Sequence, residues 1–300
     1  MRYDYFSDGE LIQMHEASVE ILKRIGISTS SDRLRGLFLD NGCKEKGERI
    51  LFTEDVIDKG LKTVPSAFNI YGRNGCDLVI EMGKQKGYAQ TCVGAPSVID
   101  LETEEKRDAS LKDLEDFAKL SDALENTHLI SPVFPRDVPQ EIIVTAETAA
   151  TLRNSSKPQR ICAESSHELP YIIEVLAAVA GGMDALRERP LAYIEVSTIS
   201  PLNSGFHPAE ALIDIVEAGL PLGIVPCPMM GATGPITLAG CVAQHNAEIL
   251  SSVIASQMLK PGAPVVMSPR VTFMDMKTGL GLWAMPEQGL AAAASAQLAR

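Results

Sequence analysis

The chain has 300 residues, of which 45% are hydrophobic and 22% are charged, and its formal net charge is −12 at pH 7. This length and composition are sufficient for a sizeable buried core in one large domain or two smaller ones. The acidic balance argues against nucleic acid as a partner, because binding phosphate requires clusters of lysine and arginine. The N-terminus lacks the apolar stretch of a signal peptide, and no window approaches the ~18 uncharged apolar residues of a membrane span. We therefore expect a cytoplasmic protein that does not contact membranes.

Residues 1–87 are predicted to form a small α+β cap. Their amphipathic and strand-like patterns predict two helices followed by three short strands, at 11–25, 31–41, 50–52, 68–71 and 78–80. Ser31 is a suitable N-cap for the second helix. Asn74 and Gly75 favour a tight hairpin turn between the last two strands.

Residues 88–300 alternate between apolar strands and helical patterns at intervals of about 30 to 40 residues. The predicted strands begin near Tyr88, His128, Gln159, Leu191, Leu222 and Pro264. The predicted helices cover 111–124, 142–152, 169–180, 208–218, 235–259 and 286–298. This alternation is typical of a parallel sheet wrapped by helices, and the strands are nearly continuous apolar runs, as burial on both faces requires.

Six such units are two fewer than a closed (βα)8 TIM-type barrel contains. The final helix, GLAAAASAQLAR, is too apolar to end a chain in water and has no glycine or proline stop. We therefore predict a (βα)8 barrel truncated after six βα units, with residues 88–300 as the catalytic domain. An open doubly wound sheet is the alternative, but no glycine-rich dinucleotide fingerprint follows the first strand.

In such barrels the functional side chains come from the loops at the carboxyl ends of the strands. Glu195 interrupts the apolar strand LAYIEVSTI, and a buried carboxylate needs either a ligand or a structural ion pair. Carboxylates and aromatic rings together suit a cationic substrate. The candidate substrate-binding residues are Glu195, Glu164, Asp275 and Phe206, with Arg136 and Arg270 to grip a substrate carboxylate. No metal site is predicted, because neither HExxH nor a paired His/Cys motif is present.

Residues 226–264, with HNAE at 245–248 and KPGAPV at 260–265, resemble the trimethylamine methyltransferase family. The resemblance spans nearly the whole chain and includes DNGC, TCVGAPSVIDLET, PRDVP and PEQGLAAAASAQLAR. It implies a barrel that transfers a methyl group from a quaternary or tertiary amine, such as glycine betaine or trimethylamine, to the Co(I) of a corrinoid. The corrinoid (cobalamin) would be supplied by a separate corrinoid protein, with no cofactor bound directly. The matching positions are Cys92, Gly94, Arg136, Asp137, Gly231, His245, Asn246, Glu248, Pro286 and Glu287.

Methyl transfer from a quaternary ammonium suits a chain with few candidate acids and bases, because the departing amine leaves neutral and needs no proton. The tasks left to the protein are holding the cation, excluding water and aligning the methyl group. We also expect a homo-oligomer. One alternative is a non-catalytic fragment that retains only a docking face for the corrinoid protein. Another is a barrel lyase or aldolase, but no lysine lies in the predicted strand cores to form a Schiff base.

Overall fold

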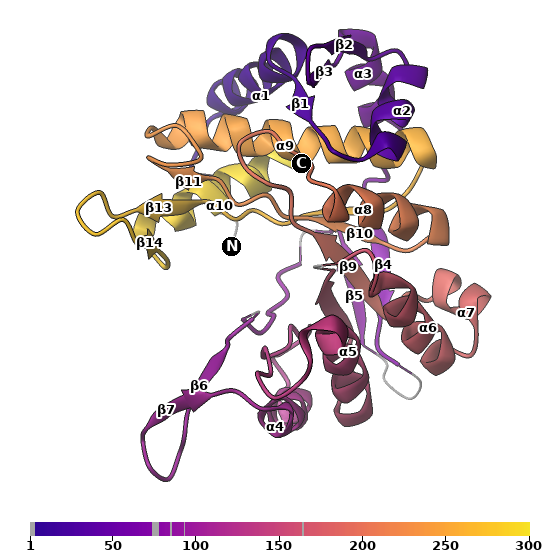
Figure 1. Cartoon of the computed structure of the whole chain (residues 1–300), viewed down its shortest axis with the longest axis vertical. Helices are drawn as coiled ribbons and strands as arrows, with labels where there is room; N and C mark the ends of the chain where they lie inside the picture. The colour runs from indigo at the N-terminus through magenta and orange to yellow at the C-terminus, as the bar shows by residue number, and fades with distance from the viewer. Residues whose placement is uncertain (1–3, 74–77, 85, 93, 164) are drawn as a thin grey trace. The chain divides into compact units, whose positions relative to one another are not determined.

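The computed structural model describes residues 4–73, 78–84, 86–92, 94–163 and 165–300 (Figure 1). Its contacts divide the chain into two compact units. The first unit consists of Met1–Pro65, Val196–Ala218 and Leu222–Arg300, and the second consists of Ser66–Glu195 and Gly219–Pro221. The predicted turn at Asn74 and Gly75 and the candidate Glu164 lie outside the described residues. The domain boundary predicted between residues 87 and 88 stays a prediction.

The second unit contains a series of parallel strand segments in chain order. Gln90 bridges Leu129 in parallel, and Ile130 bridges Gln159 in the same way. Strand β8 (Gln159–Cys162) then pairs in parallel with β9 (Ala192–Val196). The four strands predicted to begin near residues 88, 128, 159 and 191 therefore run in one direction.

Helices follow these strands along the chain. They are α4 (Leu111–Ala123), the 3-10 turn η1 (Gln140–Ile142), α5 (Ile143–Asn154), α6 (Leu169–Ala180) and α7 (Met183–Glu188). A reciprocal capping box between Ser110 and Asp113 starts α4. Gly181 ends α6 in the left-handed conformation, with φ of 93°. The unit also contains two antiparallel hairpins, β4 (Phe68–Tyr71) with β5 (Val79–Met82) and β6 (Ser97–Ile99) with β7 (Lys106–Asp108).

The first unit combines the N-terminal elements with the last part of the chain. Its N-terminal elements are α1 (Asp8–Arg24), β1 (Ile27–Ser28), α2 (Asp32–Asp40), β2 (Lys44–Lys46), β3 (Arg49–Leu51) and α3 (Glu54–Thr63). The later elements are α8 (His207–Ala218), β10 (Leu222–Ile224), β11 (Met229–Met230), α9 (Leu238–Leu259), β12 (Val265–Met267), β13 (Thr272–Met274), β14 (Gly281–Leu282) and α10 (Pro286–Leu298). β10 and β12 are parallel, as are β11 and β13.

Helix α9 forms the core of the first unit. All of its residues from Cys241 to Gln257 are buried, and it packs against α1, α3, α8 and α10. The contact with α3 is close, because a Cβ added to Gly60 would lie 3.1 Å from Ile254 Cγ1. A helix that is buried on all sides shows no amphipathic pattern, so each of its polar side chains must find a hydrogen-bond partner inside the protein.

The eight predicted helices are confirmed, with ends that shift by a few residues. The start of α9 was predicted at Pro235, but the chain first closes a tight turn in which Gly234 N donates to Met229 O, and the helix begins at Leu238. Helices α3 and α7 were not predicted, because one is strongly charged and the other has only 6 residues. The mixed α/β class with parallel βα units is confirmed, whereas closure into a barrel and truncation stay predictions. No helix among the described residues is long and apolar enough to cross a membrane.

Candidate active site

Strands β8 and β9 carry a polar face. The register places Arg160 opposite Tyr193 and Cys162 opposite Glu195. Because side chains alternate along a strand, these four residues project from one face of the pair. Arg160, Tyr193 and Glu195 are buried, with 5%, 3% and 0% of their surface exposed. A concentration of polar groups inside a parallel sheet is characteristic of a functional centre.

Arg160 and Glu195 form a buried ion pair. The Nε of Arg160 donates to Glu195 Oε2 over 2.8 Å, and its Nη2 donates to the same oxygen. Burial acts to lower the pKa of the Arg160 guanidinium, but the charge and hydrogen bonds of Glu195 outweigh it and the net shift is upward. The other oxygen, Glu195 Oε1, has no hydrogen-bond partner among the described residues.

This geometry confirms the structural ion pair that was one of the two alternatives for Glu195, and it leaves the second carboxylate oxygen buried without a hydrogen-bond partner among the described residues. Arg160 was not among the sequence-derived candidates, although its position was informative. An arginine in one apolar strand and a glutamate in the next strand of a parallel series are placed to pair across the ladder.

Arg136 and Phe134 share a cavity of about 230 Å³ that is also lined by Pro135, Val138, Gln140 and Ile143. The cavity follows the carboxyl end of the strand segment that contains Leu129 and Ile130. The backbone N–H of Arg136 donates to Ala109 O over 2.7 Å, so the loop is fixed while the Arg136 side chain is exposed. An aromatic ring beside a guanidinium group can receive a small molecule that carries both a cation and a carboxylate.

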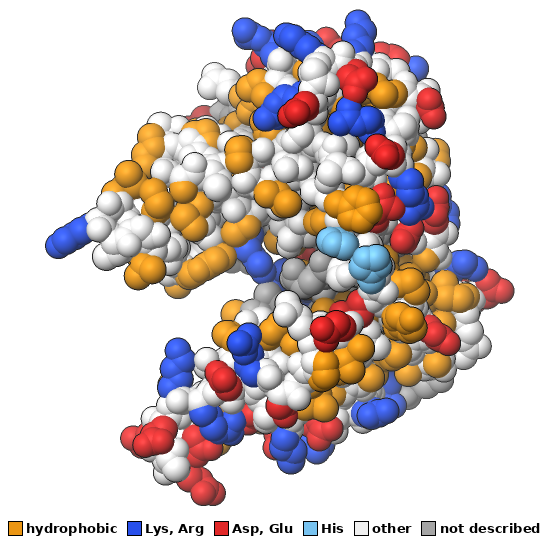
Figure 2. All heavy atoms as spheres, viewed as in Figure 1, with side chains coloured by type: hydrophobic (Ala, Val, Ile, Leu, Met, Phe, Trp, Pro, Cys, Tyr) orange, Lys and Arg blue, Asp and Glu red, His pale blue; other side chains and the backbone are white. Residues whose placement is uncertain are grey.

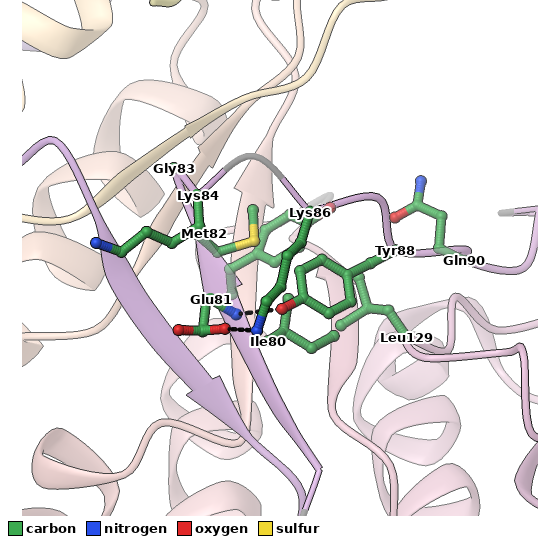
Figure 3. Close-up of a pocket in the computed structure, with 10 residues that line it drawn as sticks. Ile80, Glu81, Met82, Gly83, Lys84, Lys86, Tyr88, Gln90 and Leu129 are labelled. Carbon is green, nitrogen blue, oxygen red and sulfur yellow. Dashed lines mark hydrogen bonds and ion pairs between the residues drawn. The ribbon is translucent and has the colours of Figure 1, made fainter. Parts of the chain in front are cut away.

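A second cavity lies at the opposite, amino ends of these strands (Figure 3). It has a volume of about 220 Å³ and is lined by the β4–β5 hairpin together with Tyr88, Gln90, Leu129 and Tyr193. Glu81 N donates to Tyr88 Oη over 3.1 Å, and Lys86 forms an ion pair with the Glu81 carboxylate. The hairpin therefore supplies most of the lining of this cavity.

The other sequence-derived candidates lie in the first unit. Asp275 accepts from Lys277 N over 2.9 Å and from Thr278 Oγ1 over 2.8 Å, and these hydrogen bonds lower the pKa of its carboxyl group. Both of its oxygens thus serve the turn between β13 and β14. Phe206 is 47% exposed and packs edge-to-face against His207, with ring centroids 5.3 Å apart. Neither residue shares an interaction with Arg270 among the described contacts.

Arg270 follows β12 and contacts α9 through its backbone. The Arg270 N–H donates to His245 Nε2 over 3.3 Å. His245 is completely buried, and burial lowers the pKa of its imidazole from 6.5 to about 4. The ring is therefore neutral at pH 7, and its Nε2 acts as an acceptor for the loop after β12.

Glu248, three residues further along α9, binds the loop after β9. Its Oε2 accepts from Ser200 Oγ over 2.6 Å, and its Oε1 accepts from Leu202 N and Gln244 Nε2, each over 2.9 Å. Burial raises the pKa of the Glu248 carboxyl, and these hydrogen bonds oppose part of that rise. Leu202 has a φ of 53°, a left-handed conformation that is unfavourable for leucine, so the bond to Glu248 helps to hold a strained loop.

The HNAE segment therefore ties three elements to one buried helix. His245 holds the loop after β12, Glu248 holds the loop after β9, and Asn246 Nδ2 donates to Ser18 Oγ of α1 over 3.0 Å. From the sequence, this segment was noticed only through its resemblance to a family. Its burial was not predicted, because polar residues on a helix ordinarily face solvent. Its interactions position strand-end loops, and the same loops carry Arg270 and Ser200.

The parallel βα units define an α/β protein in which polar residues follow several of the strands. The family model for trimethylamine methyltransferase (MTTB) matches residues 1–300, and the chain belongs to that family. It is 32% identical over 298 residues to the trimethylamine methyltransferase MttB of Desulfitobacterium hafniense, which confirms the resemblance seen in the sequence. It is 30% identical over 301 residues to a glycine betaine methyltransferase from another strain of that organism.

These alignments cover 98% and 100% of this chain but 60% and 62% of the two relatives, so the chain spans about three fifths of their length. Among solved structures, the hydroxylamine complex of MtmB aligns with 88% of this chain and 60% of its own, at 13% identity and a TM-score of 0.48.

Proposed function

We propose that this protein acts in the cytoplasm as a methyltransferase that moves a methyl group from a quaternary or tertiary amine to the Co(I) of a corrinoid. The corrinoid belongs to a separate partner protein. The family match over residues 1–300 carries this proposal, because it covers every strand-end loop described above. The two relatives are named for activity on trimethylamine and on glycine betaine, which supplies the class of donor.

The reaction needs little acid–base chemistry from the protein. Cobalt(I) donates an electron pair to the methyl carbon, the C–N bond breaks, and its electron pair stays on the nitrogen of the departing amine. For a quaternary donor this amine is neutral, so no proton moves. A tertiary donor such as trimethylamine must react as its protonated ammonium ion, and the departing amine is then neutral as well. The protein contributes by binding the cation in a water-poor site and by aligning the methyl group with the incoming cobalt.

We assign the donor to the carboxyl ends of the second unit's strands. Phe134 offers an aromatic face for an N-methylated cation, and Arg136 in the same cavity offers two parallel N–H groups for a carboxylate. Glu195 Oε1 adds negative potential to the polar face of β8 and β9. We further propose that the methyl donor is a zwitterion of the glycine betaine type.

A panel of methyl donors tests both the methyltransferase activity and the choice of a zwitterionic donor. The full chain is mixed with the reduced corrinoid protein and either glycine betaine, tetramethylammonium or trimethylamine, and cobalt methylation is followed by absorbance. We expect methylation from at least one amine. Methylation from none of them would contradict the activity and favour the non-catalytic docking alternative.

Arg136→Gln separates the carboxylate contact from the rest of the site. We expect the variant to raise the KM for glycine betaine about tenfold or more while leaving that for tetramethylammonium unchanged, because only the first donor has a carboxylate to lose. Arg153→Gln is the matched control, since Arg153 is an exposed arginine on α5. Equal effects on both donors would remove Arg136 from the site.

A further inference from the structure

We propose that the β6–β7 hairpin is the docking element for the corrinoid protein, with Leu101 as an apolar anchor that enters a pocket bordered by basic side chains. This inference rests on the proposed function for the existence of that partner. It specifies which surface of this chain binds the corrinoid protein and which chemistry the partner's binding surface has.

The hairpin exposes apolar side chains at its tip. Leu101 has 97% of its surface exposed, more than any other large hydrophobic residue among those described, and Ile99 is 69% exposed. Single exposed apolar residues are common on protein surfaces. Two of them at the tip of a projecting hairpin are placed to enter a partner, and Figure 1 shows β6 and β7 extending away from α4.

The tip is held rigidly in this conformation. Asp100 Oδ1 accepts from Glu102 N over 3.1 Å and from Thr103 N over 3.2 Å. Arg107 Nε donates to Asp100 Oδ2, and its two terminal nitrogens donate to the Asp113 carboxylate over 2.7 and 2.9 Å. Asp113 also belongs to the capping box of α4, in which its side chain accepts from the backbone N–H of the N-cap residue Ser110, so the hairpin is braced against a helix. A rigid loop that presents a leucine to solvent loses little conformational entropy when the leucine is buried by a partner.

The charges around the tip select the partner's chemistry. Glu102, Glu104 and Glu105 are exposed, and their carboxylates form no ion pair within the described ranges. Figure 2 shows acidic and basic side chains gathered over this hairpin at the lower left. A second copy of this chain, with its net charge of −12, is a poor match for an acidic rim. A distinct protein with Lys or Arg around an apolar pocket is complementary.

The hairpin also stands at the appropriate end of the strands. It lies in the connection between the strand segment at Gln90 and helix α4, and is therefore a strand-to-helix loop. The Phe134 and Arg136 cavity follows the next strand at the same end. A protein that presents a methyl acceptor must approach this end, because the donor is assigned to it.

The test measures binding and turnover with purified corrinoid protein from the same organism. Leu101→Asp is compared with Leu120→Asp, because Leu120 is a 60% exposed leucine on α4 of the same unit. We expect Leu101→Asp to weaken binding of the corrinoid protein, measured by titration, and to raise its KM by about tenfold or more. Leu120→Asp should stay within about twofold of wild type. Thermal midpoints of both variants should match wild type, because neither leucine is buried.

Two further measurements complete the experiment: one removes the acidic charges of the hairpin, and the other replaces the corrinoid protein by a free methyl acceptor. Replacing Glu102, Glu104 and Glu105 by Gln should slow association and reduce its dependence on salt. With free cob(I)alamin as the acceptor, Leu101→Asp should react like wild type, because no protein docks. The docking proposal would be overturned if Leu101→Asp bound the corrinoid protein as tightly as wild type. It would also be overturned if Leu120→Asp weakened that binding to the same extent. Failure of wild type to methylate either acceptor would instead refute the proposed function, and the titration would still decide whether the hairpin binds the corrinoid protein.

Discussion

The buried pair of Arg160 and Glu195 allows a quantitative test of the structure. Its side chains are 6% and 0% exposed, whereas those of the surface pair Lys112 and Asp116 are 67% and 55% exposed. Removing one member of a buried pair leaves an uncompensated charge in a poorly solvated place, which costs about 3 to 5 kcal/mol. We therefore expect Arg160→Met to lower the free energy of unfolding by that amount, while Lys112→Met changes it by less than about 0.5 kcal/mol.

The double variant Arg160→Met with Glu195→Leu removes both charges and leaves apolar side chains of similar size. Its cost should be smaller than that of Arg160→Met alone, which gives a coupling energy of about 2 kcal/mol or more. Urea unfolding followed by far-ultraviolet circular dichroism is the assay, because the single tryptophan, Trp283, lies in the other unit. Additive effects of the two substitutions would refute the ion pair.

Two further predictions concern α9. The unfolded state binds a proton at His245 near pH 6.5 and the folded state only near pH 4, so the free energy of unfolding should fall by about 3 kcal/mol as the pH falls through that window. His245→Gln keeps an acceptor for Arg270 N and should lose this part of the slope in urea titrations; an unchanged slope would contradict the neutral buried ring. Glu248→Ala leaves the donors of Ser200, Leu202 and Gln244 without their acceptor and should cost about 3 kcal/mol. Glu287→Ala, at an exposed residue of α10, should cost less than about 0.5 kcal/mol, and similar thermal midpoints for the two variants would argue against the hydrogen-bond network.

The regular alternation of apolar runs and helical patterns along the sequence was sufficient to predict the parallel strands and most helices. Apolar runs such as those at Gln159 and Leu222 are buried on both faces in parallel sheets, so they are recognisable without knowing their neighbours. Helix α3 was missed although its sequence carries an amphipathic signal, because Val56, Ile57 and Gly60 lie on one buried face and Thr53 caps the first turn.

The site was harder to predict, because partners depend on register and on contacts between distant elements. Glu195 was identified as a buried charge, but Arg160 lies 35 positions away and only the β8–β9 ladder brings them together. Asp275 was selected as a carboxylate after a strand, and the structure shows that a local turn occupies its oxygens. Arg136 was named on chemical grounds, but the cavity that it shares with Phe134 follows from the fold of one loop.

Transfer of an isotopically labelled methyl group from the amine to cobalt is the decisive test of the proposed methyltransferase activity. The full chain is incubated with the reduced corrinoid protein and glycine betaine or trimethylamine carrying ¹³C in its N-methyl groups, and both products are followed by nuclear magnetic resonance. We expect label to appear on cobalt together with one equivalent of the demethylated amine. Unchanged donor, in a sample where a different methyl donor methylates the same cobalt, would contradict it.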